Sequence, residues 1–166
     1  RLSPAQRKRV LDLDEAIRGE ERARALLDHP ASPGDATARA VLDRAEAQLA
    51  RGEATAALAT VEPIIRANPA WPAPRWLVAR AHEHLGRYDD AERVLTVLLQ
   101  LQPSSAEAWR RLGLILAEHG GALEADRAAE ALRQALALEP RWWDLWLARA
   151  RVALRAGHPD DAEQAL

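Results

Sequence analysis

Residues 106–140 read AEAWRRLGLILAEHGGALEADRAAEALRQALALEP, and they carry the pattern that organises the whole chain. In the second half of this stretch, Ala128, Leu132, Ala135 and Leu136 fall at intervals that place them on one face of a helix. A Gly-Gly pair at 120–121 separates the two halves, and Pro140 closes the second. The stretch therefore predicts a unit of helix, turn, helix and proline.

The same unit recurs along the chain. A proline follows an apolar helical run three times, at Pro69, Pro103 and Pro140, and a glycine turn precedes the runs at Gly52 and Gly86. No stretch alternates apolar and polar residues convincingly, so we expect no sheet. Recurrence of one helix pair is typical of helical repeat proteins, in which each pair buries its apolar faces against its neighbours.

The repeat resembles the tetratricopeptide repeat over roughly residues 36–166. The third unit matches the family pattern best, with Trp109, Leu112 and Gly113 in its first helix and Ala128 in its second, while the second unit has its tryptophan one place late, at Trp76. The resemblance implies an all-α, right-handed superhelical solenoid of antiparallel helix pairs. We expect repeats at about 36–71, 72–105, 106–142 and, truncated, 143–166.

Residues 1–35 allow two interpretations. They form either an N-terminal capping helix or a degenerate repeat, in both cases followed by a loop at Ala31–Asp35. The chain lacks methionine, and residues 160–166 stop within an apolar-periodic segment. We therefore expect it to be a fragment of a larger protein, with a frayed last pair.

Local signals predict helix ends and tryptophan positions. Ser104 and Glu107 have the spacing of a capping box, and Asp89 or Asp90 is suited to cap the helix that follows Gly86. We expect left-handed glycines at Gly86 and Gly157.

The resemblance implies that Trp109 and Trp146 pack in the core and that Trp71 and most such junction residues wedge between repeats. Trp142 and Trp143 are adjacent on a helix, which makes it hard for both to be fully buried.

Composition narrows the function. Hydrophobic residues make up 48% and charged residues 29% of the chain, with a net charge of −2. This balance is that of a globular protein without a nucleic-acid partner. Without cysteine or a long apolar run, it predicts neither thiolate chemistry nor membrane insertion. His82 and His84 are two residues apart, which does not suit a zinc pair. We expect no catalytic, cofactor or metal site, and hence no enzyme. The composition does not identify the compartment, which is left as cytoplasm or periplasm.

The resemblance also implies a binding surface, because the first helix of each tetratricopeptide pair lines a concave groove. By register, the candidate partner-binding residues are Trp76, Leu77, Arg80, His84, Arg110, Arg111, Leu114, Leu147, Arg151 and Arg155. Their mixture of apolar and basic side chains predicts a partner peptide or helix that is apolar with acidic character. The carboxylate clamp for chaperone tails is not expected, because of the five matching positions (Leu42, Glu46, Leu77, Glu107 and Arg111) only Arg111 agrees.

Three functions stay open at this point. The leading hypothesis is a protein–protein interaction scaffold, of bacterial origin by its Ala/Arg-rich composition. A second is the non-catalytic arm of a larger enzyme or of a secretion or outer-membrane assembly protein. A third is a self-association module that acts through the repeat ends or exposed tryptophans. Fold alone does not choose among them.

Overall fold

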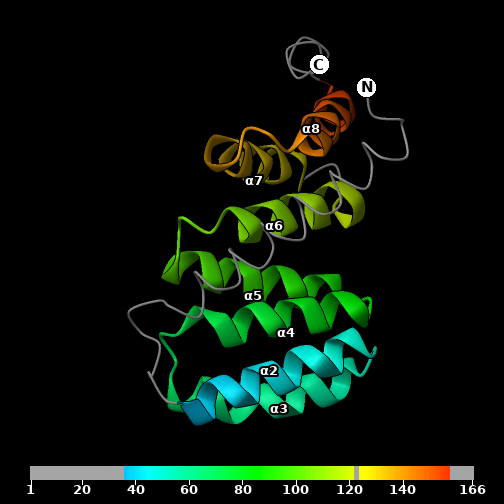
Figure 1. Ribbon diagram of the computed structural model, residues 1–166. Coiled ribbons are helices and arrows are strands. Elements are labelled where there is room, and N and C mark those ends of the chain that lie inside the picture. The colour runs from blue at the N-terminus through cyan, green and yellow to red at the C-terminus, as the bar shows by residue number, and fades with distance from the viewer. Residues whose placement is uncertain (1–35, 122–123, 158–166) are drawn as a thin grey trace, which may run out of the picture.

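The computed structural model describes residues 36–121 and 124–157, and within these ranges helices joined by turns are the regular secondary structure, with no strand. The helices run antiparallel in successive pairs, stacked as the layers of an all-α solenoid (Figure 1). Their bounds are α2 Ala36–Ala50, α3 Ala54–Ala67, α4 Pro72–His84, α5 Tyr88–Leu101, α6 Ala106–His119, α7 Ala125–Leu138 and α8 Trp143–Ala156. The predicted fold class is thus confirmed.

Glycine turns join the two helices of the first and second pairs in the same way. Gly52 and Gly86 both have positive φ, at 78° and 67°, where a side chain would be strained. After α2, the Glu53 amide donates to the Gln48 carbonyl at 2.9 Å, and after α4, the Arg87 amide donates to the His82 carbonyl at 2.9 Å. These bonds close the Schellman motif that a left-handed residue permits. The left-handed glycines expected at Gly86 and Gly157 are confirmed.

The proline junctions between pairs also share one geometry. The residue before each proline caps the preceding helix: the amides of Asn68, Gln102 and Glu139 donate to carbonyls four residues earlier at 2.8–2.9 Å. Their own carbonyls then accept bonds from Trp71, Ser105 and Trp142. Proline disfavours helix at the residue before it, so each helix ends there and the chain reverses.

The core is built from leucine and alanine, with small residues where helices approach closely. Ala79, Ala91 and Ala128 are fully buried. Gly113 of α6 packs directly on Leu132 of α7, so that an added Cβ would lie 2.7 Å from Leu132 Cδ2. Interiors at crystal-like density leave no room for such an atom. The helix pair α6–α7 therefore depends on a residue without a side chain.

Two predicted helix caps were wrong. Ser105 caps α6, accepting a bond from the Ala108 amide at 3.4 Å, so the expected capping box at Ser104 is displaced by one residue. The α5 helix begins already at Tyr88 after Arg87, which places Asp89 and Asp90 inside its first turn. There they face the positive end of the helix dipole instead of capping it.

Several expectations fall outside the described residues. These are the capping helix or degenerate repeat at 1–35 and the end of the truncated repeat at 158–166. Within the described residues, no helix has both the length and the apolar character needed to cross a membrane.

Candidate functional site

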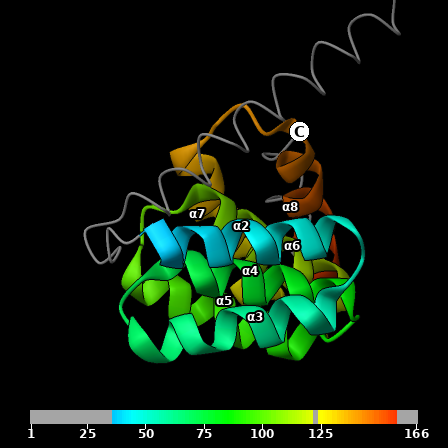
Figure 2. The same cartoon turned by 60° about the horizontal axis from the view of Figure 1, so that its bottom comes forward.

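One surface of the solenoid is formed by the first helices of successive pairs. We call the exposed sides of α2, α4, α6 and α8 the first-helix face. The view along the stack shows α2 and α3 side by side, with the later pairs behind them (Figure 2). Ion pairs connect α2 to α4, α4 to α6 and α6 to α8, which establishes that these helices are neighbours. This is the surface predicted to line the groove.

Most predicted arginines of this face are neutralised within the chain. Arg80 Nη1 donates to Glu46 Oε1 at 3.1 Å, and Arg111 Nη1 donates to Glu83 Oε2 at 3.1 Å. Arg111 Nε also bonds Glu107 Oε1 at 3.2 Å, on its own helix. Each of the first two contacts spans a repeat junction. These arginines therefore bridge neighbouring repeats, and their charge is already balanced.

Arg110 completes the series at the next junction. Its Nη2 donates to Asp144 Oδ2 at 2.9 Å, and its guanidinium lies 5.5 Å from the centre of the Trp142 ring. Trp142 is buried, so the cation covers an indole that is enclosed on its other sides. Both contacts fix α8 to α6, since charge-assisted bonds and cation–π contacts strengthen when they are partly desolvated.

Glu83 is a largely buried acid of this face. Its Oε2 accepts from Arg111, whereas its Oε1 is buried and accepts no hydrogen bond. Burial raises the pKa of Glu83 above its usual value, and the neighbouring Arg111 opposes this only in part. Glu83 thus carries a desolvation cost that its ion pair does not fully offset.

Other predicted contact residues have little surface to offer. Trp76 and Leu77 are buried, because their side chains lie against the core, and Leu114 is half-buried against it. His84 is exposed as the last residue of α4. The middle of the first-helix face therefore presents paired charges more than apolar anchors.

The α8 end of the face is different. Leu147 and Leu154 are exposed by 41% and 61%, and Arg151 lies between them in sequence, exposed and without an ion-pair partner in the described part of the chain. Arg155 Nη1 contacts only the Gly120 carbonyl, at 3.4 Å. Trp143 begins the helix with 70% of its surface exposed. Exposed apolar side chains beside unpaired cations are the chemistry of recognition rather than catalysis.

The tryptophans divide by position. Trp71 and Trp142 are buried at repeat junctions, and Trp143 is the exposed member of the adjacent pair. Trp109 and Trp146, expected in the core, are only half-buried. Their indole Nε1 atoms donate to the carbonyls of Pro103 and Pro140, at 2.8 and 3.3 Å. These bonds keep the nitrogen-bearing edges of the two indoles near the surface, and each links the first helix of a pair to the preceding proline turn.

Sequence reasoning missed the partners of the arginines. Glu46 and Arg80 are 34 residues apart, and so are Arg110 and Asp144. This equals the Pro69–Pro103 spacing and is three less than the Pro103–Pro140 spacing of 37. Opposite charges about one repeat apart were the signal that could have found them. Among the residues described here, no group of three or more His, Asp or Glu side chains is placed to hold a metal ion.

Comparison with known proteins agrees with this architecture. Two family models described as tetratricopeptide repeat match residues 72–115 and 121–166. No protein of curated function matches the sequence.

Solved structures show the same fold at low sequence identity. A crystal structure of MamA superposes with a TM-score of 0.70 and 19% identity, over 99% of this chain and 91% of that one. The first tetratricopeptide domain of Spaghetti (RPAP3), bound to an HSP90 peptide, gives 0.64 and 18%, over 72% of this chain and 95% of its own. A mutant O-GlcNAc transferase of Thermobaculum terrenum gives 0.61 and 22%, covering 71% of this chain and 22% of the transferase.

Proposed function

Because this chain belongs to the tetratricopeptide repeat family, a family of protein-interaction scaffolds, we propose that its first-helix face binds a segment of another protein at the α8 end. The bound segment is apolar with acidic character. RPAP3, a structural neighbour, is seen with a peptide bound, which supports recognition of a peptide by this architecture.

The carrying observation is the exposed surface of α8. Leu147, Arg151 and Leu154 recur at intervals of three and four residues, so they share one side of the helix. Burying exposed leucines is favourable by about 25 cal/mol per Å² of apolar surface. Arg151, which lies between the two leucines in sequence, fixes the orientation of the bound segment by pairing with one of its carboxylates.

The charge balance of the face supports an acidic partner. Arg80, Arg110 and Arg111 are occupied by carboxylates of the chain itself, so a ligand would have to break these pairs to use them. Arg151 and Arg155 have no carboxylate partner in the described residues. An acidic group of the partner therefore gains the most binding free energy at α8, where it does not have to displace a carboxylate of the chain itself.

Recognition of chaperone tails by a carboxylate clamp is not part of this proposal. Leu42 and Leu77 stand at two clamp positions and are buried, and Arg111 already binds Glu83 and Glu107. The peptide bound by RPAP3 is therefore a precedent for the architecture alone.

Selection from a phage-displayed library of random peptides on this chain tests the proposal. Synthetic copies of the enriched peptides are then measured by fluorescence anisotropy against Leu154→Asp and Arg151→Gln. We expect enriched peptides to combine leucine-like and acidic residues. Each substitution should weaken their binding about tenfold or more. Arg151→Gln removes a charged hydrogen-bond donor, which contributes about 1.5–3 kcal/mol. Leu154→Asp removes a leucine whose burial contributes a similar amount, and it places a carboxylate against an acidic peptide.

Matched controls come from exposed residues away from this face. Leu138→Asp changes a leucine that is 41% exposed on α7, and Arg66→Gln changes an exposed arginine of α3 that is paired with Glu62. Both should bind as the wild type does. Peptides that bind the α8 variants and the wild type equally would refute the α8 site.

A further inference from the structure

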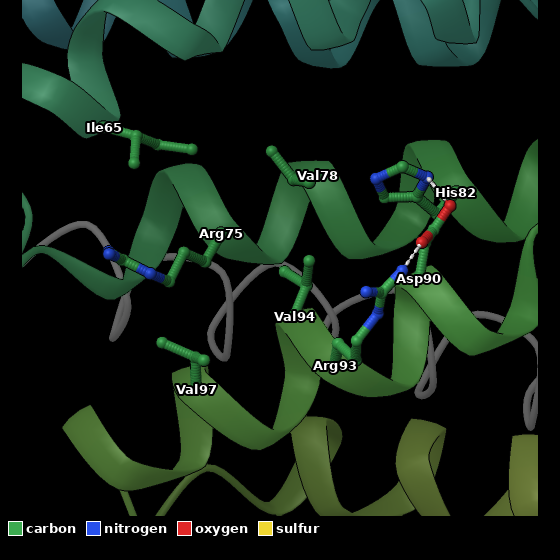
Figure 3. Close-up of a pocket in the computed structure, with 8 residues that line it drawn as sticks. All are labelled: Ile65, Arg75, Val78, His82, Asp90, Arg93, Val94 and Val97. Carbon is green, nitrogen blue, oxygen red and sulfur yellow. Dashed lines mark hydrogen bonds and ion pairs between the residues drawn. The ribbon is translucent and has the colours of Figure 1, made fainter.

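A separate pocket lies on the other side of the solenoid, away from the first-helix face. It has a volume of about 510 Å³, and its apolar walls are Ile65 of α3, Val78 of α4, and Val94 and Val97 of α5 (Figure 3). Val97 is 41% exposed although it is aliphatic. The pocket is thus an open, apolar groove between the second helices, with α4 as its floor.

The pocket carries one cation without a carboxylate partner. Arg75 lies at one end, and its Nη1 contacts only the Trp71 carbonyl, at 3.4 Å. At the other end Arg93 is paired with Asp90, whose Oδ2 also lies 3.7 Å from His82 Nδ1 (Figure 3). Burial lowers the pKa of His82, which favours the uncharged imidazole. The local charge is therefore positive and resides on Arg75.

The next repeat has a pocket at the equivalent place. It has a volume of about 460 Å³, and Trp109, Leu112 and Leu116 of α6 stand at the register of Arg75, Val78 and His82. Trp109 uses its Nε1 on the Pro103 carbonyl, so this pocket has no counterpart of the Arg75 charge. Two apolar grooves thus flank α5 on the same face of the solenoid, and only the first has a free cation at its end.

We propose that this face binds a second polypeptide segment, which places an aliphatic side chain between Val78 and Val97 and an adjacent carboxylate on Arg75. Charge complementarity selects the acid, because Arg75 is the uncompensated charge and a guanidinium binds carboxylates in two-pronged geometry. The paired grooves select a polypeptide over a small molecule, because they lie on either side of a helix that is about 10 Å across. An extended chain that crosses α5 can reach both with side chains about four residues apart, which point to the same side. The chain then binds partners on two opposite faces.

The test uses the whole chain and the same phage-displayed random peptide library, with synthetic enriched peptides measured by fluorescence anisotropy. Arg75→Gln keeps the aliphatic stem and removes the charge, and Val97→Asp places an acid on an exposed wall. For peptides of this face, Arg75→Gln should weaken binding about tenfold or more by removing a charged hydrogen-bond donor. Val97→Asp should weaken it by a similar factor, because it removes an apolar contact and repels the acid of the ligand. Arg66→Gln and Leu138→Asp are the matched controls, and circular dichroism verifies that every variant is folded.

The two faces are separated by cross-testing. Peptides of this pocket should bind Leu154→Asp and Arg151→Gln normally, and should shift the methyl NMR signals of Ile65 and Val78. Failure of the α8 site would leave these results unchanged. The proposal is overturned if no enriched peptide depends on Arg75 or Val97. It is equally overturned if decanoate, tested as a small amphiphilic acid, shifts those methyl signals while no peptide does.

Discussion

Gly113 offers the sharpest test of how this stack is held together. In Gly113→Ala, the new Cβ would lie 2.7 and 2.9 Å from Cδ2 and Cγ of Leu132 and 3.1 Å from its backbone nitrogen. Leu132 is fully buried, so it has no free space to move into. Overpacking of this kind costs about 1–3 kcal/mol. Alanine recovers about 1 kcal/mol of helix propensity. We expect a net loss of about 1 kcal/mol.

The double variant with Leu132→Ala isolates the contact. Leu132→Ala alone should cost about 2–5 kcal/mol through the cavity that it leaves. In that background the two side-chain contacts below 3.0 Å are gone and only the 3.1 Å approach to the backbone nitrogen remains, so Gly113→Ala should no longer destabilise the chain. The coupling between the two substitutions should therefore approach the overpacking cost, about 2 kcal/mol.

Urea denaturation of the four proteins, followed by circular dichroism, measures this coupling. Ala79→Gly is the reverse control, because Ala79 holds the same register in α4 and is fully buried there. It should lose about 1 kcal/mol from helix propensity and about 0.8 kcal/mol from the buried methyl group that it removes. Additive effects of Gly113→Ala and Leu132→Ala would show that the two helices adapt freely, and the reasoning on close packing would fail.

Three further outcomes are expected. Ser105→Ala should lower the free energy of unfolding by about 1 kcal/mol, because Ser105 provides the cap of α6. Ser104→Ala should leave it unchanged, and thermal denaturation of the two variants makes the comparison. Gly86→Ala should cost about 1–2 kcal/mol because φ is positive at 67°, whereas Gly121→Ala should be nearly neutral in urea titrations, as neither glycine has an atom within 4 Å of an added Cβ. Glu83→Gln should gain stability relative to the wild type at neutral pH. Because the pKa of Glu83 is raised in the folded state, its ionised form lowers the stability of the wild type above that pKa. The stability difference between Glu83→Gln and the wild type should therefore shrink as the pH falls toward about 4. A difference that grows on acidification would contradict the raised pKa.

The fold was accessible from the sequence because its signals are local. Gly52 and Gly86 mark turns that only a left-handed residue closes well, and each junction proline ends a helix whatever lies beyond it. The caps could not be assigned from the sequence, because Ser104 and Ser105 are chemically alike and a shift of one residue decides which hydroxyl reaches the Ala108 amide.

The candidate site was less accessible, because it depends on how repeats pack. Arg80 and Arg111 have the chemistry of peptide contacts in isolation. Only the stack brings Glu46 and Glu83 within 3.1 Å of them. Burial of Trp76 likewise follows from the neighbouring pair, and the α4–α5 pocket draws on α3 as well, so helical spacing within one segment could not predict either feature.

The ion pairs across the junctions also distribute mechanical stiffness. The α4–α5 and α6–α7 layers are tied on both faces, by Glu83–Arg111 and by Glu92–Arg127. Between the α2–α3 and α4–α5 layers, the ion pairs seen in residues 36–121 tie one face alone, through Glu46–Arg80. Bending in either direction strains an ion pair at the junction between the α4–α5 and α6–α7 layers. At the junction between the α2–α3 and α4–α5 layers, no ion pair seen in residues 36–121 resists widening or narrowing of the side opposite Glu46–Arg80. That side contains the Ile65–Val97 groove, so a change in curvature becomes a change in the width of a binding pocket.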